Sequence, residues 1–242
     1  MQKNKRYLIV DAGNTRIKLG LYLEEELITL SYLSGSELDQ ISSWIKENSY
    51  DHALISSVRS ETETANMLSQ IPHSQSLKNL KIPLETDYET PQTLGSDRLA
   101  NAIAISHLTS GPALAIDVGT CIKFDFVDEH KIYRGGSISP GIRLRYQSLN
   151  DYTAALPLLD QKHCERLIGQ NTQDAIISGV INGIQGEIND FIEQYTQRFP
   201  HLTIFVTGGD AAHFDYSSKN DIFADANLTL FGLLKILKAN AS

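Results

Sequence analysis

Two short segments of the sequence each join an apolar run to an aspartate, a glycine and a small hydroxyl or amide residue. The first is 7–15 (YLIVDAGNT) and the second is 113–120 (ALAIDVGT). A glycine directly after a strand allows a sharp turn and a close approach of the backbone to a ligand. An aspartate at the strand end suits Mg²⁺ or a metal-bound water, and the N–H and hydroxyl groups that follow suit phosphate oxygens. One copy would be weak evidence, but two copies about half a chain apart indicate a polyphosphate site. The turns at 11–15 and 117–120 are called the first and the second phosphate turn below.

In the first segment, Asp11 is expected to handle Mg²⁺ through a bound water. Asn14 and Thr15 are expected to approach the β- and γ-phosphates, and Lys18 to add positive charge. The alternative is an ordinary β-turn in which Lys18 is solvated on a strand. The pattern favours the ligand role strongly for Asp11 and Gly13, and less for Lys18, because lysines on strands usually lie at the surface.

The second segment repeats this chemistry, with Asp117 facing a cation or a metal-bound water and Thr120 facing a phosphate oxygen. A third turn, Thr207-Gly208-Gly209, follows another apolar run. Adjacent glycines allow backbone to lie against an adenine or a ribose. A Gly-Gly pair also serves ordinary tight turns, but its place after two phosphate turns makes it a candidate adenosine site.

The segment Gly95-Ser96-Asp97-Arg98 puts a carboxylate beside a guanidinium at the expected start of a helix. Taken alone it indicates a helix cap with Arg98 at the surface. Beside a bound nucleotide that donates a phosphoryl group, the Asp97 carboxylate can accept the proton of an attacking hydroxyl, and Arg98 can bind an anionic group of the acceptor. The glycine-rich segment 135–142 is equally consistent with a structural loop and with a wall of the acceptor pocket. Thr172 is expected to cap a helix, which is compatible with contacting a ligand.

Composition limits the class of protein. The chain has 242 residues, 41% hydrophobic and 21% charged, which is ordinary for a soluble globular enzyme. A net charge of −8 without a Lys/Arg cluster argues against a nucleic-acid or membrane partner. Two cysteines fit a reducing compartment, and no run approaches the length of a signal-peptide core or a membrane span. The expected location is the cytoplasm.

Apolar periodicity predicts the elements that position these turns. Strands are predicted at 7–10, 16–23, 27–33, 52–56, 114–117, 123–127, 131–135, 203–206 and 221–224. Helices are predicted at 36–48, capped by Ser36, and at 61–70, 96–108, 172–199 and 227–237. The polar segment 72–93 has no assignment.

Three antiparallel strands followed by helix and strand, twice over, are the plan of the actin-like ATPase superfamily. The predicted fold class is therefore α/β, with two related actin-like (ribonuclease H-like) lobes. Each lobe has a mixed, five-stranded type of sheet flanked by helices, and the nucleotide cleft lies between them. The expected lobes are residues 1–108 and 109–242.

The whole set of motifs resembles the type III pantothenate kinases, which phosphorylate pantothenate in the first step of coenzyme A synthesis. The resemblance spans nearly the whole chain, and the Gly-x-Asp-Arg helix start at 95–98 is its most specific part. It implies that Asp97 is the general base and that Asp117 binds a monovalent cation (K⁺ or NH₄⁺). It also implies a homodimer in which Thr172 acts across the interface. The implied cofactors are ATP with Mg²⁺ and the monovalent cation.

The residues that the resemblance assigns fall into two sets. The ATP-binding set is Asp11, Ala12, Gly13, Asn14, Thr15, Arg16, Ile17, Lys18 and Thr120, to which the glycine turn adds Gly208 and Gly209. The pantothenate-binding set is Tyr88, Gly95, Ser96, Asp97, Arg98 and Thr172, with Arg98 as the partner of the pantothenate carboxylate.

One departure from the family pattern follows the second turn, where the chain has Cys121-Ile122-Lys123 in place of small and Thr residues. Period-two counting puts Lys123 and Asp125 on one face of their strand, but does not say whether that face points inwards. If it does, the ammonium of Lys123 can replace the monovalent cation or reach a phosphate, and the dependence on K⁺ would be weakened.

The alternatives to a pantothenate kinase are a kinase of the same fold for another small hydroxylated acceptor, and an ATP-binding regulator without turnover. The intact Asp11, Asp97 and Asp117 weigh against the regulator, because a regulator has no need to keep the base and both metal-side carboxylates.

Overall fold

The computed structural model describes residues 4–13, 16–34, 38–216 and 221–241. The chain forms two compact units. The first comprises 1–85, 89–107 and 227–242, and the second comprises 86–88 and 108–226. The units meet in sequence within a residue of the expected division at 108/109, but the C-terminal segment groups with the first unit and not with the second. The expected N-cap Ser36 lies outside the described residues.

The first unit contains a five-stranded sheet in the order β3-β2-β1-β4-β5. Strands β1, β2 and β3 are antiparallel neighbours, whereas β4 and β5 continue the sheet in parallel from β1. The strands are β1 (Arg6–Ala12), β2 (Arg16–Leu23), β3 (Glu26–Ser34), β4 (His52–Ser57) and β5 (Ser74–Ser76). Because β1 and β4 are parallel, their carboxyl ends reach the same edge of the sheet.

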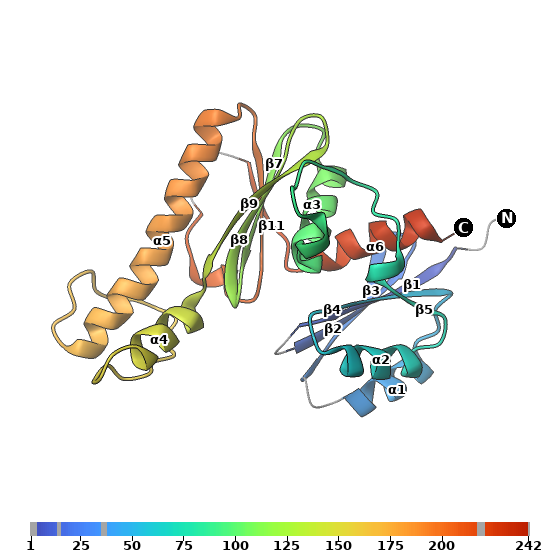
Figure 1. Cartoon of the computed structure of the whole chain (residues 1–242), viewed down its shortest axis with the longest axis horizontal. Helices are drawn as coiled ribbons and strands as arrows, with labels where there is room; N and C mark the ends of the chain where they lie inside the picture. The colour runs from blue at the N-terminus through green and yellow to red at the C-terminus, as the bar shows by residue number, and fades with distance from the viewer. Residues whose placement is uncertain (1–3, 14–15, 35–37, 217–220, 242) are drawn as a thin grey trace. The chain divides into compact units, whose positions relative to one another are not determined.

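Helices cover both faces of this sheet. On one face, Leu8 and Val10 of β1 pack with Ile41 of α1 (Leu38–Glu47) and Met67 of α2 (Glu61–Gln70). Figure 1 shows α1 and α2 together on this side. On the other face, β1 packs with α3 (Ser96–Leu108) and α6 (Leu228–Asn240). The apolar side chains of α6 therefore complete the first core, which explains why residues 227–242 do not join the second unit.

The second unit repeats the plan with one strand more. Its sheet has the order β11-β10-β7-β8-β9-β6, in which β9-β8-β7-β10-β11 matches β3-β2-β1-β4-β5 of the first unit. Antiparallel and parallel pairings match as well. The strands are β6 (Glu85–Thr86), β7 (Ala113–Val118), β8 (Cys121–Val127), β9 (Ile132–Pro140), β10 (Thr203–Thr207) and β11 (Ile222–Ala224). The repeated order confirms two actin-like α/β lobes.

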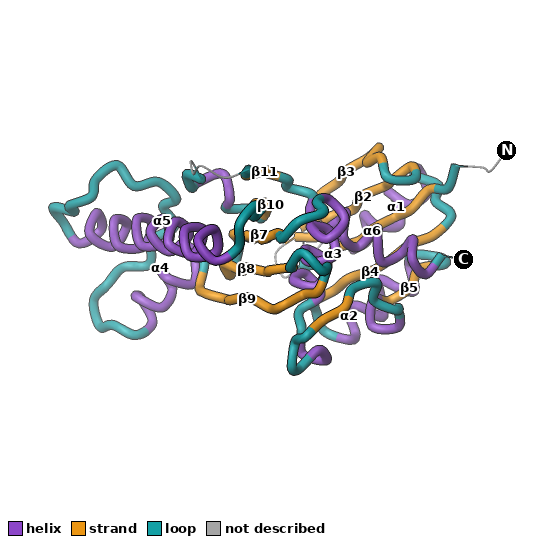
Figure 2. The backbone as a smooth tube through the Cα atoms, turned by 90° about the horizontal axis from the view of Figure 1, so that it is seen from above, coloured by secondary structure: helices purple, strands orange, loops and turns teal. Residues whose placement is uncertain are grey.

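One face of the second sheet packs against α4 (Ile142–Asp151) and the long α5 (Thr172–Arg198). Ile116 and Phe124 on this face meet Ile184 and Ile188 of α5, and Figure 2 shows α4 beside the N-terminal part of α5. Short 3₁₀ turns complete the fold at Leu77–Asn79, Pro91–Thr93 and Ala211–His213. No helix in the described part of the chain has the length and apolar character needed to cross a membrane.

Most elements match the sequence expectations, with three differences. Strand β9 continues to Pro140, through much of the segment 135–142 that glycines had marked as a loop. Helix α4 follows it and was not expected. The unassigned segment 72–93 contains the short strands β5 and β6 and two 3₁₀ turns.

Candidate functional site

The first phosphate turn lies at the carboxyl end of β1. Asp11 is half-buried, with Lys18 of β2 and Ser56 of β4 as its neighbours in register. The N–H of Gly13 donates to the Arg16 carbonyl at 3.0 Å and closes the turn. Asn14 and Thr15 lie outside the described residues.

The other residues expected to bind ATP here differ in exposure. Ala12 and Ile17 are buried in the core, so only their backbone can face a ligand, and Arg16 is exposed. Lys18 is half-buried, and its Nζ lies 6.0 Å from the centroid of the exposed Tyr32 ring. This distance is within the reach of a cation–π contact.

Arg59 is a residue of the first turn that sequence reasoning missed. Its Nε donates to the Gly13 carbonyl at 2.9 Å, and its side chain is only 5% exposed. Glu63 lies 3.5 Å from the guanidinium. Ser60 and Glu63 form a capping box that starts α2 just beyond β4, and this fixes where Arg59 stands. A basic residue just after the strand parallel to β1 was the available signal, because the two strand ends share one edge.

The second phosphate turn lies at the carboxyl end of β7. The N–H of Gly119 donates to the Cys121 carbonyl at 3.1 Å, and the following Thr120 is exposed. Asp117 and Lys123 are cross-strand partners in the β7–β8 ladder. Their Oδ2 and Nζ atoms are 2.7 Å apart, with side chains 13% and 15% exposed. The Lys123 face therefore points inwards, onto the Asp117 carboxylate.

Backbone packing fixes this turn from the side of β10, where Thr207 is the neighbour of Asp117. Gly208 has φ +103°, and a Cβ there would lie 2.2 Å from the Val118 carbonyl oxygen and 2.6 Å from Asp117 Oδ1. Only glycine fits such a position. A Cβ on Gly209 would meet no described atom within 4 Å, so this residue keeps an open approach to its backbone.

Asp210 and His213 continue the segment beyond the glycines. The Asp210 N–H donates to the Val118 carbonyl at 2.9 Å, and its carboxylate pairs with Lys162. Burial, and then the positive charge of Lys162, hold the pKa of His213 below its ordinary value of 6.5, while Asp210 opposes them. The second turn thus has a titrating neighbour.

The end of β9 closes the second turn from the other side. The N–H of Gly141 donates to the Thr120 carbonyl at 3.0 Å, and a Cβ on Gly141 would lie 2.0 Å from the Gly119 carbonyl oxygen. The glycine-rich segment that the sequence left open between two roles is therefore partly a strand, and its Gly141 buttresses the phosphate turn.

Asp97 and Arg98 lie in the first turn of α3, in the first unit. Asp97 Oδ1 accepts the Arg98 N–H at 2.8 Å, and a Cβ on Gly95 would lie 2.7 Å from that oxygen. A helix N-terminus favours negative charge at this carboxylate. Arg98 is buried to 4% exposure, so it is not the surface arginine of the simple capping interpretation.

The remaining acceptor candidates belong to the second unit. Tyr88 packs beside Gly135 of β9, where a Cβ would lie 3.5 Å from its ring, and its ring centroid is 5.9 Å from that of Tyr133. Tyr88 therefore groups with the second sheet, whereas Gly95–Arg98 group with the first.

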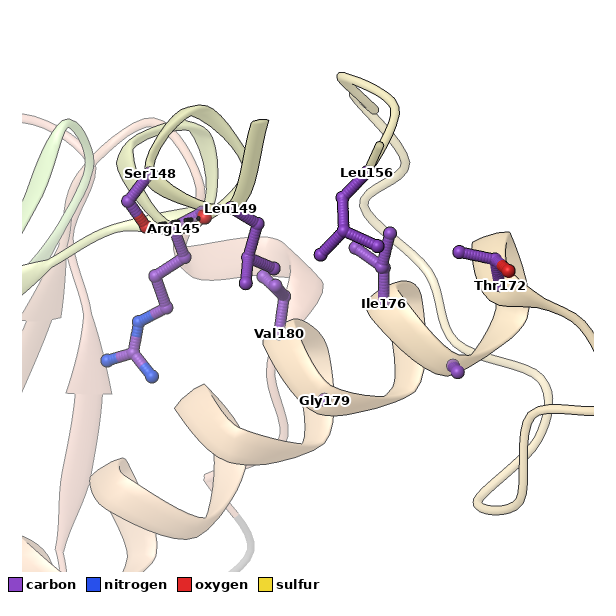
Figure 3. A pocket seen from close by; sticks show the side chains of 9 residues that line it. Arg145, Ser148, Leu149, Leu156, Thr172, Ile176, Gly179 and Val180 are labelled. Atoms are coloured by element: carbon purple, nitrogen blue, oxygen red, sulfur yellow. Dashed lines mark hydrogen bonds between the residues drawn. The ribbon is translucent and has the colours of Figure 1, made fainter. Parts of the chain in front are cut away.

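Thr172 is the first residue of α5, but the N-cap is Asn171, whose side chain accepts the Asp174 N–H. The expectation that Thr172 caps the helix is therefore wrong. Its exposed side chain lines a cavity of about 620 Å³ between α4 and α5 (Figure 3). Leu149 and Leu156 face Ile176 and Val180 there, with Arg145 at one end. The cavity combines an apolar wall with one guanidinium and two hydroxyls, those of Ser148 and Thr172.

Metal binding by protein ligands alone finds little support. Within the ranges that the structure describes, no three His, Cys, Asp or Glu side chains gather to hold an ion. Asp11 is a half-buried carboxylate at a strand end, which fits a metal held mainly by phosphates and water. The arrangement can therefore serve phosphoryl transfer from a metal-bound nucleotide.

Comparison with known proteins gives one family. A model described as type III pantothenate kinase matches residues 7–194. A type III pantothenate kinase of Cytophaga hutchinsonii is 37% identical over 235 residues, covering 96% of this chain and 99% of that protein. Another from Phocaeicola vulgatus is 38% identical over 237 residues, covering 96% and 98%. Among solved structures, a Baf family protein from Campylobacter jejuni has a TM-score of 0.64 at 24% identity, covering 96% and 98%, which shows the fold alone.

Proposed function

Because the chain belongs to the type III pantothenate kinase family, we propose that it transfers the γ-phosphoryl group of ATP to the hydroxyl of pantothenate. The products are 4′-phosphopantothenate, ADP and a proton. The observation that carries the proposal is the repeated turn at the carboxyl ends of β1 and β7, two equivalent strands of two sheets with the same order. Reactions of this kind depend on positioning and charge stabilisation more than on covalent chemistry by the protein.

Asp97 is the proposed general base. Its carboxylate accepts the proton of the pantothenate hydroxyl as that oxygen attacks the γ-phosphorus. The helix N-terminus and the Arg98 N–H support its negative charge. Arg98, with a guanidinium confined by burial, is the proposed partner of the pantothenate carboxylate, with Tyr88, Gly95 and Ser96 as further acceptor contacts.

ATP is the proposed donor. Backbone groups of the first turn, with Lys18, and the Thr120 hydroxyl would contact its phosphates, and Gly208 and Gly209 its nucleoside. Mg²⁺ would neutralise phosphate charge and lower the barrier to transfer. Asp11 fits such an ion through a bound water, because it is a half-buried carboxylate at the end of β1.

A homodimer is the proposed form of the enzyme in the cytoplasm, with Thr172 acting in the acceptor site of the partner subunit. Large apolar side chains at the C-terminal end of α4 and shortly before Thr172 in the sequence are left in solvent: Tyr152 is 89% exposed, Leu167 79% and Ile168 78%. Large exposed apolar side chains are typical of a protein contact. Gly179 and Gly186 of α5 also face open space among the described atoms, which allows a close approach of another backbone.

The activity test is phosphoryl transfer from ATP to pantothenate by the purified protein with Mg²⁺, beside Asp97→Asn. We expect 4′-phosphopantothenate with the parent protein and a loss of about 10²–10⁴-fold in kcat with the variant. Unchanged nucleotide affinity in the variant would separate loss of the base from loss of the fold. ATP binding without any product from pantothenate would overturn the proposal.

The shared site has its own test in mixed dimers. Asp97→Asn and Thr172→Val homodimers each carry one defect in both sites. A dimer with one chain of each has one site with both defects and one site with none. Co-purified mixed dimers should therefore regain activity well above either parent, and no regain would place Thr172 in its own subunit's site or in none.

A further inference from the structure

The charge balance at the second phosphate turn differs from that expected by family resemblance. Asp117 was the expected ligand of a monovalent cation. Instead, its Oδ2 is 2.7 Å from Lys123 Nζ, within salt-bridge and hydrogen-bond distance. The two side chains are 13% and 15% exposed, so solvent screens the pair only weakly. The negative charge that would attract K⁺ is already neutralised by a protein ammonium.

The strand register makes this contact a built-in feature. Asp117 and Lys123 face one another in the antiparallel β7–β8 ladder, on the sheet face opposite Ile116, Ile122 and Phe124, which pack towards α5. Directly opposed residues on one face lie close enough for their side chains to interact. Lysine at 123 therefore reaches Asp117 without a loop having to move.

The other oxygen of the carboxylate is also constrained. A Cβ on Gly208 would lie 2.6 Å from Asp117 Oδ1, and one on Gly119 would lie 3.9 Å from it. The carboxylate is thus enclosed by two glycine turns and the lysine. A K⁺ ion needs several oxygen ligands and a net negative charge to repay its lost hydration, and the donor set at Asp117 offers no unneutralised charge.

We infer that the Lys123 ammonium is the resident cation of the second phosphate turn and that this kinase works without added K⁺. The inference rests on the proposed function. Lys123 holds Asp117 in place and supplies one fixed positive charge beside the Gly119–Thr120 turn, where the ATP phosphates are proposed to bind. At this turn the fixed ammonium supplies the positive charge that a bound monovalent cation would supply, and it does not have to bind from solution.

The first experiment measures two quantities in parallel, kcat/KM for ATP and ATP affinity by calorimetry. Both are measured in K⁺, Na⁺ and choline salts at one ionic strength of about 0.1 M, so that general screening is constant. We expect the parent protein to vary by less than about twofold, a free-energy difference of under 0.5 kcal/mol. Steep activation by K⁺ would overturn the inference while leaving pantothenate phosphorylation intact. Absence of product in every salt would instead count against the proposed function.

The second experiment uses Lys123→Ala, which removes the ammonium and leaves space beside Asp117. Without K⁺, ATP affinity and kcat/KM should fall about 10- to 100-fold, and K⁺ or NH₄⁺ should restore much of both, whereas choline should not. A loss that no cation restores, in a variant with the parent's thermal melt, would contradict a cation role.

Lys235→Ala is the matched control. Lys235 Nζ pairs with Glu25 at 2.6 Å, and its side chain is 14% exposed, so Lys235 resembles Lys123 in the length of its ion pair and in its own burial, although Glu25 is 50% exposed. It lies on α6 in the first unit and pairs with Glu25 of the turn between β2 and β3, at the end of β2 opposite the first phosphate turn. This variant should gain no response to K⁺. A similar response in both variants would show a general salt effect and would overturn the inference, and the salt series on the parent protein decides the matter even if Lys123→Ala does not fold.

Discussion

The two phosphate turns have the same topology but are stabilised differently. In both, an aspartate near a strand end faces a lysine across an antiparallel ladder: Asp11 faces Lys18, and Asp117 faces Lys123. The Lys18 ammonium lies 6.0 Å from the centroid of the exposed Tyr32 ring, and the Lys123 ammonium lies 2.7 Å from Asp117 Oδ2. A guanidinium from a neighbouring segment supports the first turn, and close backbone packing supports the second. The two turns thus share the position of an aspartate and a lysine, but different contacts support them.

The largest effect is expected from the glycines that pack against the second turn. Gly208→Ala and Gly141→Ala would bring a Cβ within 2.2 Å and 2.0 Å of a backbone oxygen. Gly13→Ala would meet one only at 3.2 Å. We expect losses of about 2–4 kcal/mol in unfolding free energy at the second turn and about 1 kcal/mol or less at the first, measured by urea denaturation. Equal losses would remove the proposed contrast in packing.

The next effect tests the guanidinium of the first turn. Arg59→Met removes the Nε–H that donates to the Gly13 carbonyl. We expect kcat/KM for ATP to fall about 10- to 100-fold, because the turn loses a buried charged hydrogen bond. Arg6→Met is the control, since its guanidinium bonds only the exposed Ser49 in the contacts described. An Arg59 variant as active as this control would show that the first turn keeps its conformation without the Arg59 hydrogen bond.

A smaller effect is expected from Lys18→Met. The Lys18 ammonium is opposite Asp11 in the strand ladder and adds positive charge near the proposed phosphate site, so its removal should raise KM for ATP by about threefold to tenfold. Potassium should not restore it, in contrast to Lys123→Ala. Titration of ATP with and without K⁺ in the two variants makes the comparison directly, and rescue of Lys18→Met by K⁺ would mean that the two lysines are equivalent.

The smallest effect concerns pH and the second turn alone. The folded-state pKa of His213 lies below 6.5, chiefly because of burial, so the unfolded chain binds more protons near that pH. Its contribution to stability is present above pH 6.5 and is lost as the pH falls through the folded-state value. The melting temperature of the parent protein should therefore fall as the pH is lowered from about 7.5 to 5.5. The melting temperature of the His213→Asn variant should fall less over the same range. His130→Asn, with a side chain 72% exposed, should keep the parent's slope.

Much of the fold was predictable because the sequence alternates clearly where strands have one buried face. The strand 16–23 and the helices 61–70 and 96–108 have the predicted bounds. Glycine misled the prediction at β9. Gly136 had suggested a loop, but a Cβ there would lie 1.6 Å from the Phe124 carbonyl oxygen, so the glycine allows a close approach of β9 to its antiparallel neighbour β8. Helix α4 was not predicted because only Ile142 and Tyr146 are buried on it, and two residues are too few to give a helical period of apolar positions in the sequence.

The site was less accessible to sequence reasoning, because side-chain direction depends on packing. The two-residue period of a strand puts Lys123 and Asp125 on the same face of β8. That this face is buried follows only from the pairing of β7 with β8 and from the buried 2.7 Å hydrogen bond that the Tyr133 hydroxyl donates to Asp125. Arg59 carries no motif of its own, and its position follows from the parallel pairing of β1 with β4. The placement of α6 in the first unit likewise depends on tertiary packing, which the sequence pattern does not show.

That placement of α6 has a consequence for synthesis on the ribosome. Leu230, Leu233 and Leu234 of α6 complete the core around Tyr7 and Ile9, so more than two hundred residues of translation separate the two sides of one core. The first unit therefore cannot close while its own strands leave the exit tunnel, and it must wait with an apolar sheet face uncovered. The second unit, with its residues ending at 226, is complete earlier. The half of the protein that is translated first therefore needs the end of the chain to complete its core.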